Sequence, residues 1–149
     1  MKNLVMAIGA VLIALSLGVS SYAVDTGGGA DSSNPSVPTM SQVRADITAE
    51  HWKSAIEKLK LIVAENGTAD AYNLLGFSYR NLGDYKRAAQ FYARALKLDP
   101  NHTGALEYQG VMFVKTGEID AAKANLAKLK SICGTGCEEY RDLAEAIGG

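Results

Sequence analysis

Cysteine, proline and basic charge are all scarce in this 149-residue chain. It has two cysteines, too few for an iron–sulfur cluster, and only one of its three prolines lies beyond residue 40. Fifteen Lys and Arg stand against 16 Asp and Glu. Because a surface for nucleic acid or an anionic membrane needs a basic excess, this balance argues against both partners.

Catalytic motifs are also missing. The sequence has no Ser-His-Asp set, no HExxH motif and no phosphate-binding glycine loop, since the glycines at 27–29 follow no strand and precede no helix. The two histidines, His51 and His102, are far from the cysteines in sequence. We therefore expect a protein that is not an enzyme and that binds no cofactor or metal ion.

The N-terminus predicts export. Lys2 precedes an apolar run over residues 4–19, and Ser21 and Ala23 are the small residues that a signal peptidase reads. This is the three-part pattern of a secretory signal peptide at residues 1–23. The alternative, a retained membrane anchor, would normally have a longer run and a charged stop-transfer cluster. We expect cleavage after Ala23 and location in the periplasm of a Gram-negative bacterium.

The rest of the chain divides into a linker and one domain. Cleavage would leave 126 residues with 14 basic and 16 acidic side chains, and no membrane attachment. Residues 24–40 are rich in Gly, Ser, Asp and Pro and predict a flexible linker, because they cannot bury enough apolar surface to offset the entropy of ordering. From residue 41 to 149, apolar residues recur at helical spacing and no run alternates as a strand does, which predicts an all-α domain.

A 34-residue period runs through this domain. Shifting residues 71–100 by 34 positions matches Gly76 with Gly110, Tyr79 with Phe113, Gly83 with Gly117 and Ala88 with Ala122. Fixed-period similarity of this kind indicates stacked helical hairpins. Gly83 and Gly117 should end helices in the left-handed conformation.

Two of the recurring glycines fall in the middle of predicted helices. There Gly76 and Gly110 each cost about 1 kcal/mol relative to Ala, which is tolerable where another helix backbone comes very close. Ala88 and Ala122 would be the small residues opposite them. The predicted repeat-packing residues are Tyr72, Gly76, Tyr79, Ala88, Gly110, Phe113 and Ala122.

These residues resemble the tetratricopeptide repeat (TPR) family. Residues 69–102 carry its pattern almost throughout, residues 103–136 less fully, and residues 41–67 mainly in the second helix, where Trp52 aligns with Tyr85 at a shift of 33. The resemblance implies an all-α, TPR-like stack, a right-handed solenoid of about three antiparallel hairpins near 41–64, 69–97 and 103–132. A capping helix at 137–147 would cover the last apolar surface.

The two cysteines flank the turn before this capping helix. Exported proteins meet oxidants, so Cys133 and Cys137 are expected to form a disulfide, with Gly134 and Gly136 allowing the loop to fold back. The C-x3-C segment followed by EEY is also similar to the C-terminal end of other exported TPR proteins. A redox-active or copper-binding pair is the alternative.

The resemblance also implies where a partner would bind. TPR stacks line a concave face with the first helix of each hairpin, and this face takes a protein or peptide. The carboxylate clamp of some TPR domains cannot be transferred, because Leu74 and Tyr108 occupy positions that need polar residues. The implied partner-binding residues are Asp70, Asn73, Phe77, Arg80, Asn81, Glu107, Val111, Val114 and Lys115.

The sequence therefore predicts an exported, non-catalytic interaction module that binds a partner protein. An alternative of another class is a periplasmic thiol redox or copper-handling protein that uses Cys133 and Cys137. A third alternative is a homo-oligomer in which the incomplete first hairpin docks on another copy.

Overall fold

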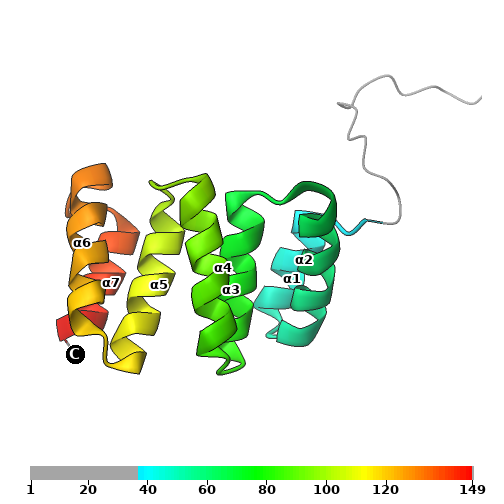
Figure 1. The fold of residues 1–149 in the computed structure, drawn as a ribbon, viewed down its shortest axis with the longest axis horizontal. Coiled ribbons are helices and arrows are strands. Elements are labelled where there is room, and N and C mark those ends of the chain that lie inside the picture. The colour runs from blue at the N-terminus through cyan, green and yellow to red at the C-terminus, as the bar shows by residue number, and fades with distance from the viewer. Residues whose placement is uncertain (1–36, 149) are drawn as a thin grey trace, which may run out of the picture. The chain divides into compact units, whose positions relative to one another are not determined.

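The computed structural model describes residues 37–148, so the predicted signal peptide and most of the predicted linker lie outside the described residues. Within this range the chain is all helical and forms three hairpins followed by a single helix (Figure 1). The predicted all-α, TPR-like fold is confirmed. The helices are α1 (Met40–Thr48), α2 (Trp52–Asn66), α3 (Ala69–Asn81), α4 (Tyr85–Leu98), α5 (Thr103–Thr116), α6 (Ile119–Cys133) and α7 (Glu138–Gly148).

None of the described helices is long and apolar enough to cross a membrane. The apolar run over residues 4–19 lies outside them. Helix α1 begins at Met40, the last residue of the predicted linker, because the Thr39 hydroxyl accepts a hydrogen bond from the Gln42 N–H and the Gln42 side chain caps Thr39 in return.

Each hairpin reverses through one residue with a left-handed backbone. Gly83 has φ 78° and Gly117 has φ 84°, as the period predicts, and Glu50 has φ 57° between α1 and α2. Glu50 aligns with Gly83 at the same shift of 33 that superimposes Trp52 on Tyr85. The first hairpin therefore keeps the turn geometry of the repeat, although it has a glutamate in place of the glycine that adopts a left-handed backbone at little cost in free energy.

Two apolar clusters hold the helices together. The first lies between the first two hairpins and reaches Met112 of α5; its largest fully buried side chain is Tyr92. The second consists of Leu106, Leu129 and Leu143, from α5, α6 and α7. Since α7 contributes Leu143 directly to this cluster, it closes the apolar end of the third hairpin, as predicted for a capping helix.

The mid-helix glycines make room for side chains and not for a helix backbone, which corrects the expectation above. A Cβ atom on Gly76 would lie 2.6 Å from Cδ1 and Cε1 of Tyr92, and one on Gly110 would lie 2.5 Å from Cδ2 of Leu143. Each glycine is therefore a notch that another side chain fills. Ala88 and Ala122 are fully buried, but the heavy atoms nearest to a Cβ on Gly76 or Gly110 belong to Tyr92 and Leu143 and not to these alanines.

Helix α7 is joined to the third hairpin covalently as well as by packing. Cys133 is the last residue of α6, and Cys137 immediately precedes α7. The structure bonds them in a disulfide with their Cα atoms 5.9 Å apart. Cys133 Sγ lies 3.3 Å from the carbonyl oxygen of Leu129, a member of the leucine cluster, and the disulfide restrains the angle at which α7 leaves α6.

Candidate functional site

The surface formed by α1, α3, α5 and α7, here called the first-helix face, carries all the predicted partner-binding residues, which lie on α3 and α5. A hollow of about 280 Å³ crosses three of these helices. Arg44 and Thr48 of α1 lie on one side of it, and Tyr108 of α5 lies on the other. Leu74 and Phe77 of α3 lie between them, so the hollow has an apolar floor and a positively charged rim.

Aromatic side chains form the floor of this hollow. The Phe77 ring lies 4.7 Å from that of Tyr108 and 5.7 Å from that of Trp52, measured between ring centroids. The guanidinium carbon of Arg80 lies 5.1 Å from the Phe77 centroid and 5.5 Å from that of Tyr108, at cation–π distance. These contacts hold Arg80 over the rings, where its N–H groups can meet a carboxylate or a backbone carbonyl.

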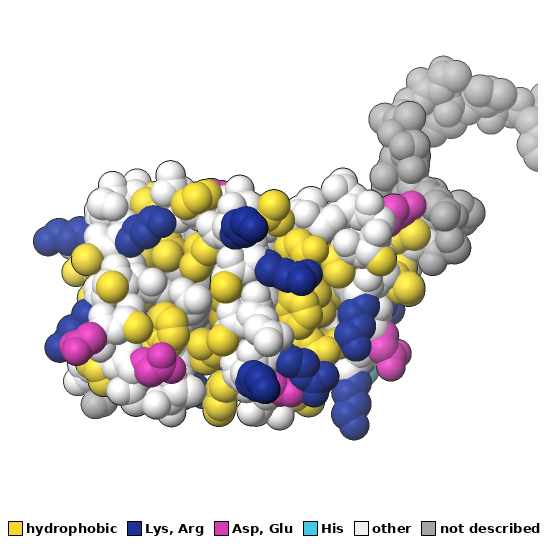
Figure 2. Space-filling model, viewed as in Figure 1, with side chains coloured by type: hydrophobic (Ala, Val, Ile, Leu, Met, Phe, Trp, Pro, Cys, Tyr) yellow, Lys and Arg dark blue, Asp and Glu magenta, His cyan; other side chains and the backbone are white. Residues whose placement is uncertain are grey.

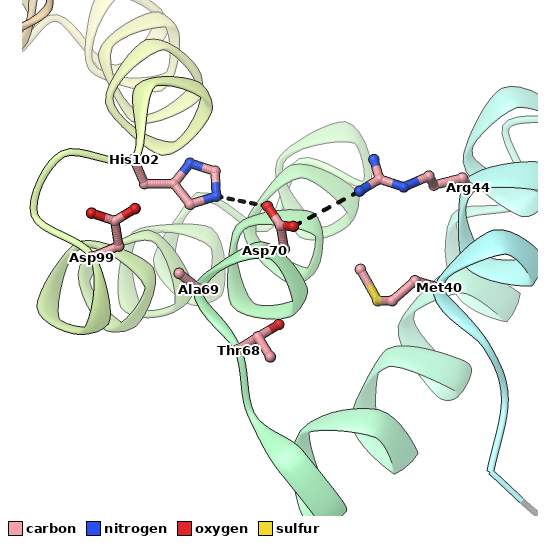
Figure 3. Close-up of a pocket in the computed structure, with 7 residues that line it drawn as sticks. All are labelled: Met40, Arg44, Thr68, Ala69, Asp70, Asp99 and His102. Carbon is pink, nitrogen blue, oxygen red and sulfur yellow. Dashed lines mark hydrogen bonds and ion pairs between the residues drawn. The ribbon is translucent and has the colours of Figure 1, made fainter. Parts of the chain in front are cut away.

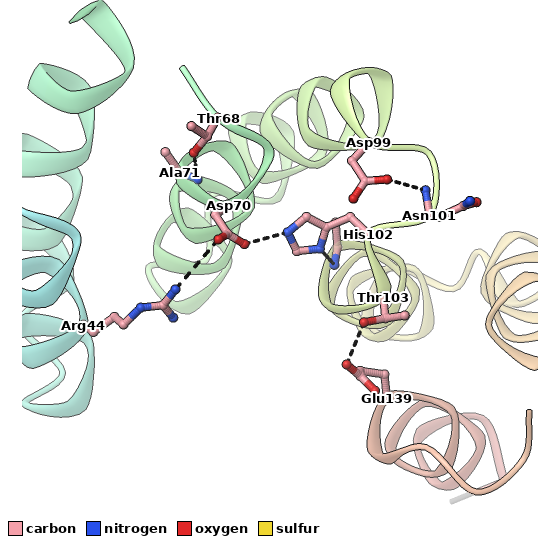
Figure 4. A network of polar contacts seen from close by, with 10 residues as sticks. Arg44, Thr68, Asp70, Ala71, Asp99, Asn101, His102, Thr103 and Glu139 are labelled. Carbon is pink, nitrogen blue, oxygen red and sulfur yellow. Dashed lines mark hydrogen bonds and ion pairs between the residues drawn. The ribbon is translucent and has the colours of Figure 1, made fainter. Parts of the chain in front are cut away.

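A second hollow of about 490 Å³ adjoins the first and shares Arg44 with it. Figure 3 shows Asp70 of α3 between Arg44 and His102. Its Oδ2 lies 4.0 Å from Nη2 of Arg44, and its Oδ1 lies 2.9 Å from Nε2 of His102. Farther along, the Thr103 hydroxyl donates to Oε1 of Glu139 at 2.7 Å (Figure 4). The first helices are thus linked at their N-terminal ends by two short polar bridges.

The capping role of His102 fixes its tautomer. Nδ1 accepts a hydrogen bond from the Ala105 N–H at 3.1 Å, so this nitrogen carries no proton. Nε2 must then carry the hydrogen, which it donates to Asp70. His102 therefore caps α5 and joins it to α3, a role that its position in a polar inter-repeat turn did not suggest.

Glu107 is the most perturbed acid of this face. Its side chain lies on α5 at 9% exposure, and no hydrogen bond or ion pair to it is found among the described residues. Burial raises the pKa of its carboxyl to about 7, with further increases from Asp142, Glu139 and Glu138 and an opposing effect from Arg80. Near neutral pH this carboxyl therefore changes its charge.

The structure divides the predicted partner-binding residues into three groups. Asp70, Phe77 and Arg80 lie at or beside the hollows. Asn73 and Glu107 are buried, at 5% and 9% exposure, so they cannot contact a partner as freely as predicted. The remaining residues do not line either hollow. The Asn81 amide donates a hydrogen bond to the carbonyl of Phe77 on its own helix, and Val111 packs on the leucine cluster. The last two of the set are Val114 and Lys115.

Sequence reasoning missed Arg44 and Tyr108 as part of this surface. Arg44 lies in the first hairpin, which matches the repeat pattern only weakly. The sequence indicates Tyr108 only as a residue unfit for a carboxylate clamp, and it predicts Trp52 of α2 as a packing residue, whose ring contacts that of Phe77. At the repeat shift of 34, Tyr108 is equivalent to Leu74 and Val111 to Phe77, so the sequence register alone does not bring Tyr108 beside Phe77.

The cysteine pair has one further neighbour of interest. Ligand atoms of Cys133, Cys137 and Glu139 lie within 4.8 Å of one another, which is a compact set of three metal-binding side chains if the disulfide were reduced. The Glu139 carboxylate also accepts the Thr103 hydrogen bond, which lowers its pKa and keeps it ionised. Geometry therefore supplies a third ligand that sequence spacing alone did not reveal.

Comparison with known proteins finds one repeat family that matches the second hairpin. Residues 69–102, which hold α3 and α4, match the tetratricopeptide repeat. The chain is 28% identical over 83 residues to the Sol locus transcriptional repressor of Clostridium acetobutylicum, covering 56% of this chain and 26% of that protein. It is 34% identical over 59 residues to the uncharacterized protein ycf37 of Guillardia theta, covering 40% of this chain and 33% of that protein.

The chain thus spans about a quarter to a third of these relatives, whose names carry no common activity. The family match, the 34-residue period and the hairpin stack agree. Together they show an all-α, TPR-like helical stack in which α3 and α4 match the tetratricopeptide repeat.

Proposed function

We propose that this protein is an exported, non-catalytic module that binds a partner protein or peptide across its first-helix face. The hollow between α1, α3 and α5 is the observation that carries the proposal, since Phe77 and Tyr108 offer apolar contact there and Arg44 and Arg80 offer charge. The tetratricopeptide match supports it, because such repeats generally mediate protein–protein contacts. Export to a periplasm rests on the signal-peptide pattern of residues 1–23.

Site-specific crosslinking in cells tests this proposal. A photoreactive residue at Thr48, which lines the hollow, should capture one discrete partner. The same residue at Ala93, which is exposed on α4, should not capture it. The purified partner should then bind Phe77→Ala and Arg44→Ala variants at least about tenfold more weakly, since aromatic and arginine anchors contribute about 2 kcal/mol or more to interfaces. Equal capture at both positions, or unchanged affinity of folded variants, would contradict the proposal.

A second candidate function is thiol-based metal handling at Cys133 and Cys137. The nearby Glu139 carboxylate favours it, although this hard ligand suits zinc better than the copper(I) that two thiolates prefer. In this case the reduced protein should bind one Cu(I) or Zn²⁺ per chain, and Glu139→Gln should weaken binding.

A structural disulfide predicts a different result. Closing so short a loop stabilises a fold by about 2 kcal/mol, so reduction or a Cys133→Ser/Cys137→Ser variant should lower the free energy of unfolding by about that amount. The reduced protein should then compete poorly with a chelator for either metal. Urea denaturation of both redox forms, together with metal titration, separates the two functions.

A further inference from the structure

Charge is sorted between the two faces of the helical stack. Helices α2, α4 and α6, here called the second-helix face, carry ten Lys and Arg but only three Asp and Glu, and α4 carries no acid. Helices α1, α3, α5 and α7 carry four basic and seven acidic residues. The near-neutral net charge of the chain therefore hides one strongly basic surface.

The basic side chains of this face are available for contact. Nine of the ten lie exposed, and among the described residues only Lys58 and Arg87 take part in an ion pair. Figure 2 shows one face of the stack, on which Lys and Arg side chains are scattered among hydrophobic ones and Asp and Glu side chains are also visible. The exposed basic residues are Lys53, Lys60, Lys86, Arg87, Arg94, Lys97, Lys123, Lys128 and Lys130.

Exposed leucines lie within the same surface. Leu61 of α2 is 53% exposed and Leu98 of α4 is 56% exposed, the two highest values among the large apolar side chains described. The repeat shifts of 33 and 34 place Leu61, Arg94 and Lys128 at equivalent positions of α2, α4 and α6. Leu98 follows Arg94 by one helical turn, and both line a shallow hollow of about 460 Å³ with Lys97 and Tyr72. Leucines and cations therefore share one arc of the second helices.

We propose that the second-helix face binds the surface of an anionic phospholipid bilayer. Lipid phosphates would attract the exposed lysines, and Leu61 and Leu98 would enter the boundary between headgroups and acyl chains. The phosphate backbone of a nucleic acid offers no apolar surface that a leucine side chain could contact. The occurrence of exposed leucines beside the cations therefore favours a lipid surface. This proposal goes beyond partner binding and is independent of it, because the first-helix face would stay free.

Vesicle co-sedimentation of the protein as isolated from cells, with the same N-terminus in every variant, tests this inference. The probes are vesicles of phosphatidylcholine alone and of phosphatidylcholine with about 30% phosphatidylglycerol, at low and high salt. A Lys60→Glu/Lys97→Glu/Lys128→Glu variant should bind the anionic vesicles at least about tenfold more weakly. A first-helix-face variant with the same change in charge, Arg44→Glu/Lys115→Glu/Arg141→Glu, should bind nearly as the wild type does. All three proteins share one N-terminus, so any contribution of residues 1–23 cancels.

The leucines distinguish a lipid surface from other polyanions. Leu61→Ser/Leu98→Ser should weaken vesicle binding several-fold while leaving binding to duplex DNA or heparin unchanged. Circular dichroism confirms that each variant is folded. Equal loss in both charge variants, no dependence on phosphatidylglycerol, or tighter binding to duplex DNA than to vesicles would overturn the proposal.

Discussion

Gly76→Leu is expected to lower the free energy of unfolding by about 3 kcal/mol or more, or to prevent folding. A Cβ atom at this position would already lie 2.6 Å from the Tyr92 ring, and Tyr92 is fully buried. The ring cannot move aside without emptying the first apolar cluster. Over-packing of this kind costs about 1–3 kcal/mol and more when several atoms are added. Urea denaturation followed by circular dichroism measures the change.

Ala93→Leu provides the matched control. Ala93 is adjacent to Tyr92 in sequence but exposed on α4, so the same added side chain should change stability by no more than about 0.5 kcal/mol. The change in the free energy of unfolding for Gly76→Ala should lie between those of the two leucine variants, because its gain in helix propensity of about 1 kcal/mol partly offsets the clash with Tyr92. Wild-type stability in Gly76→Leu would disprove the notch that this glycine forms for Tyr92.

Glu107→Gln is expected to make the protein more stable at pH 8 but not at pH 4.5. Burial raises the pKa of the Glu107 carboxyl from an ordinary 4.5 to about 7. Because the folded-state pKa lies above the unfolded one, the stability linked to this group is complete below about pH 4.5 and is lost as the pH rises through 7. A rise of this size corresponds to about 3 kcal/mol at pH 8.

The free energy of unfolding of Glu107→Gln and wild type should therefore be compared at both pH values. Glutamine keeps the size of the side chain and removes its charge, so the difference between the proteins should grow by about 3 kcal/mol from pH 4.5 to pH 8. Glu145→Gln, on the exposed side of α7, should show no such growth. A pH-independent difference for Glu107→Gln would mean that this carboxyl is ionised without penalty in the fold.

The repeat period predicted the fold well because it reports on packing that every hairpin shares. The left-handed turns at Gly83 and Gly117 follow from the register of two glycines, since few other residues adopt that conformation cheaply. The filling of the mid-helix notches could not be predicted in the same way. A missing side chain indicates a close approach but does not say what approaches, and the answer differs between Gly76 and Gly110.

The candidate site was less predictable than the fold. Periodicity places a residue on a helix face, but it does not say how far the neighbouring helix covers that face. Asn73 is therefore buried although it shares a helix face with Phe77, and its Oδ1 has no hydrogen-bond partner among the described residues. The polar bridge from Asp70 to His102 joins residues 32 positions apart. Such contacts depend on the crossing of two helices, which a single sequence does not encode locally.

The two notches also limit how this array could grow by gene duplication. Tyr92, from the same hairpin, fills the notch at Gly76, whereas Leu143 of the terminal helix fills the one at Gly110. Copying residues 103–136 in tandem would bring the equivalent of Gln109 to the place of Leu143, because the two residues are 34 positions apart. The side-chain amide of that glutamine would then face the notch at Gly110, which an apolar side chain fills in this protein. Lengthening the array would thus require a new substitution as well as a new copy.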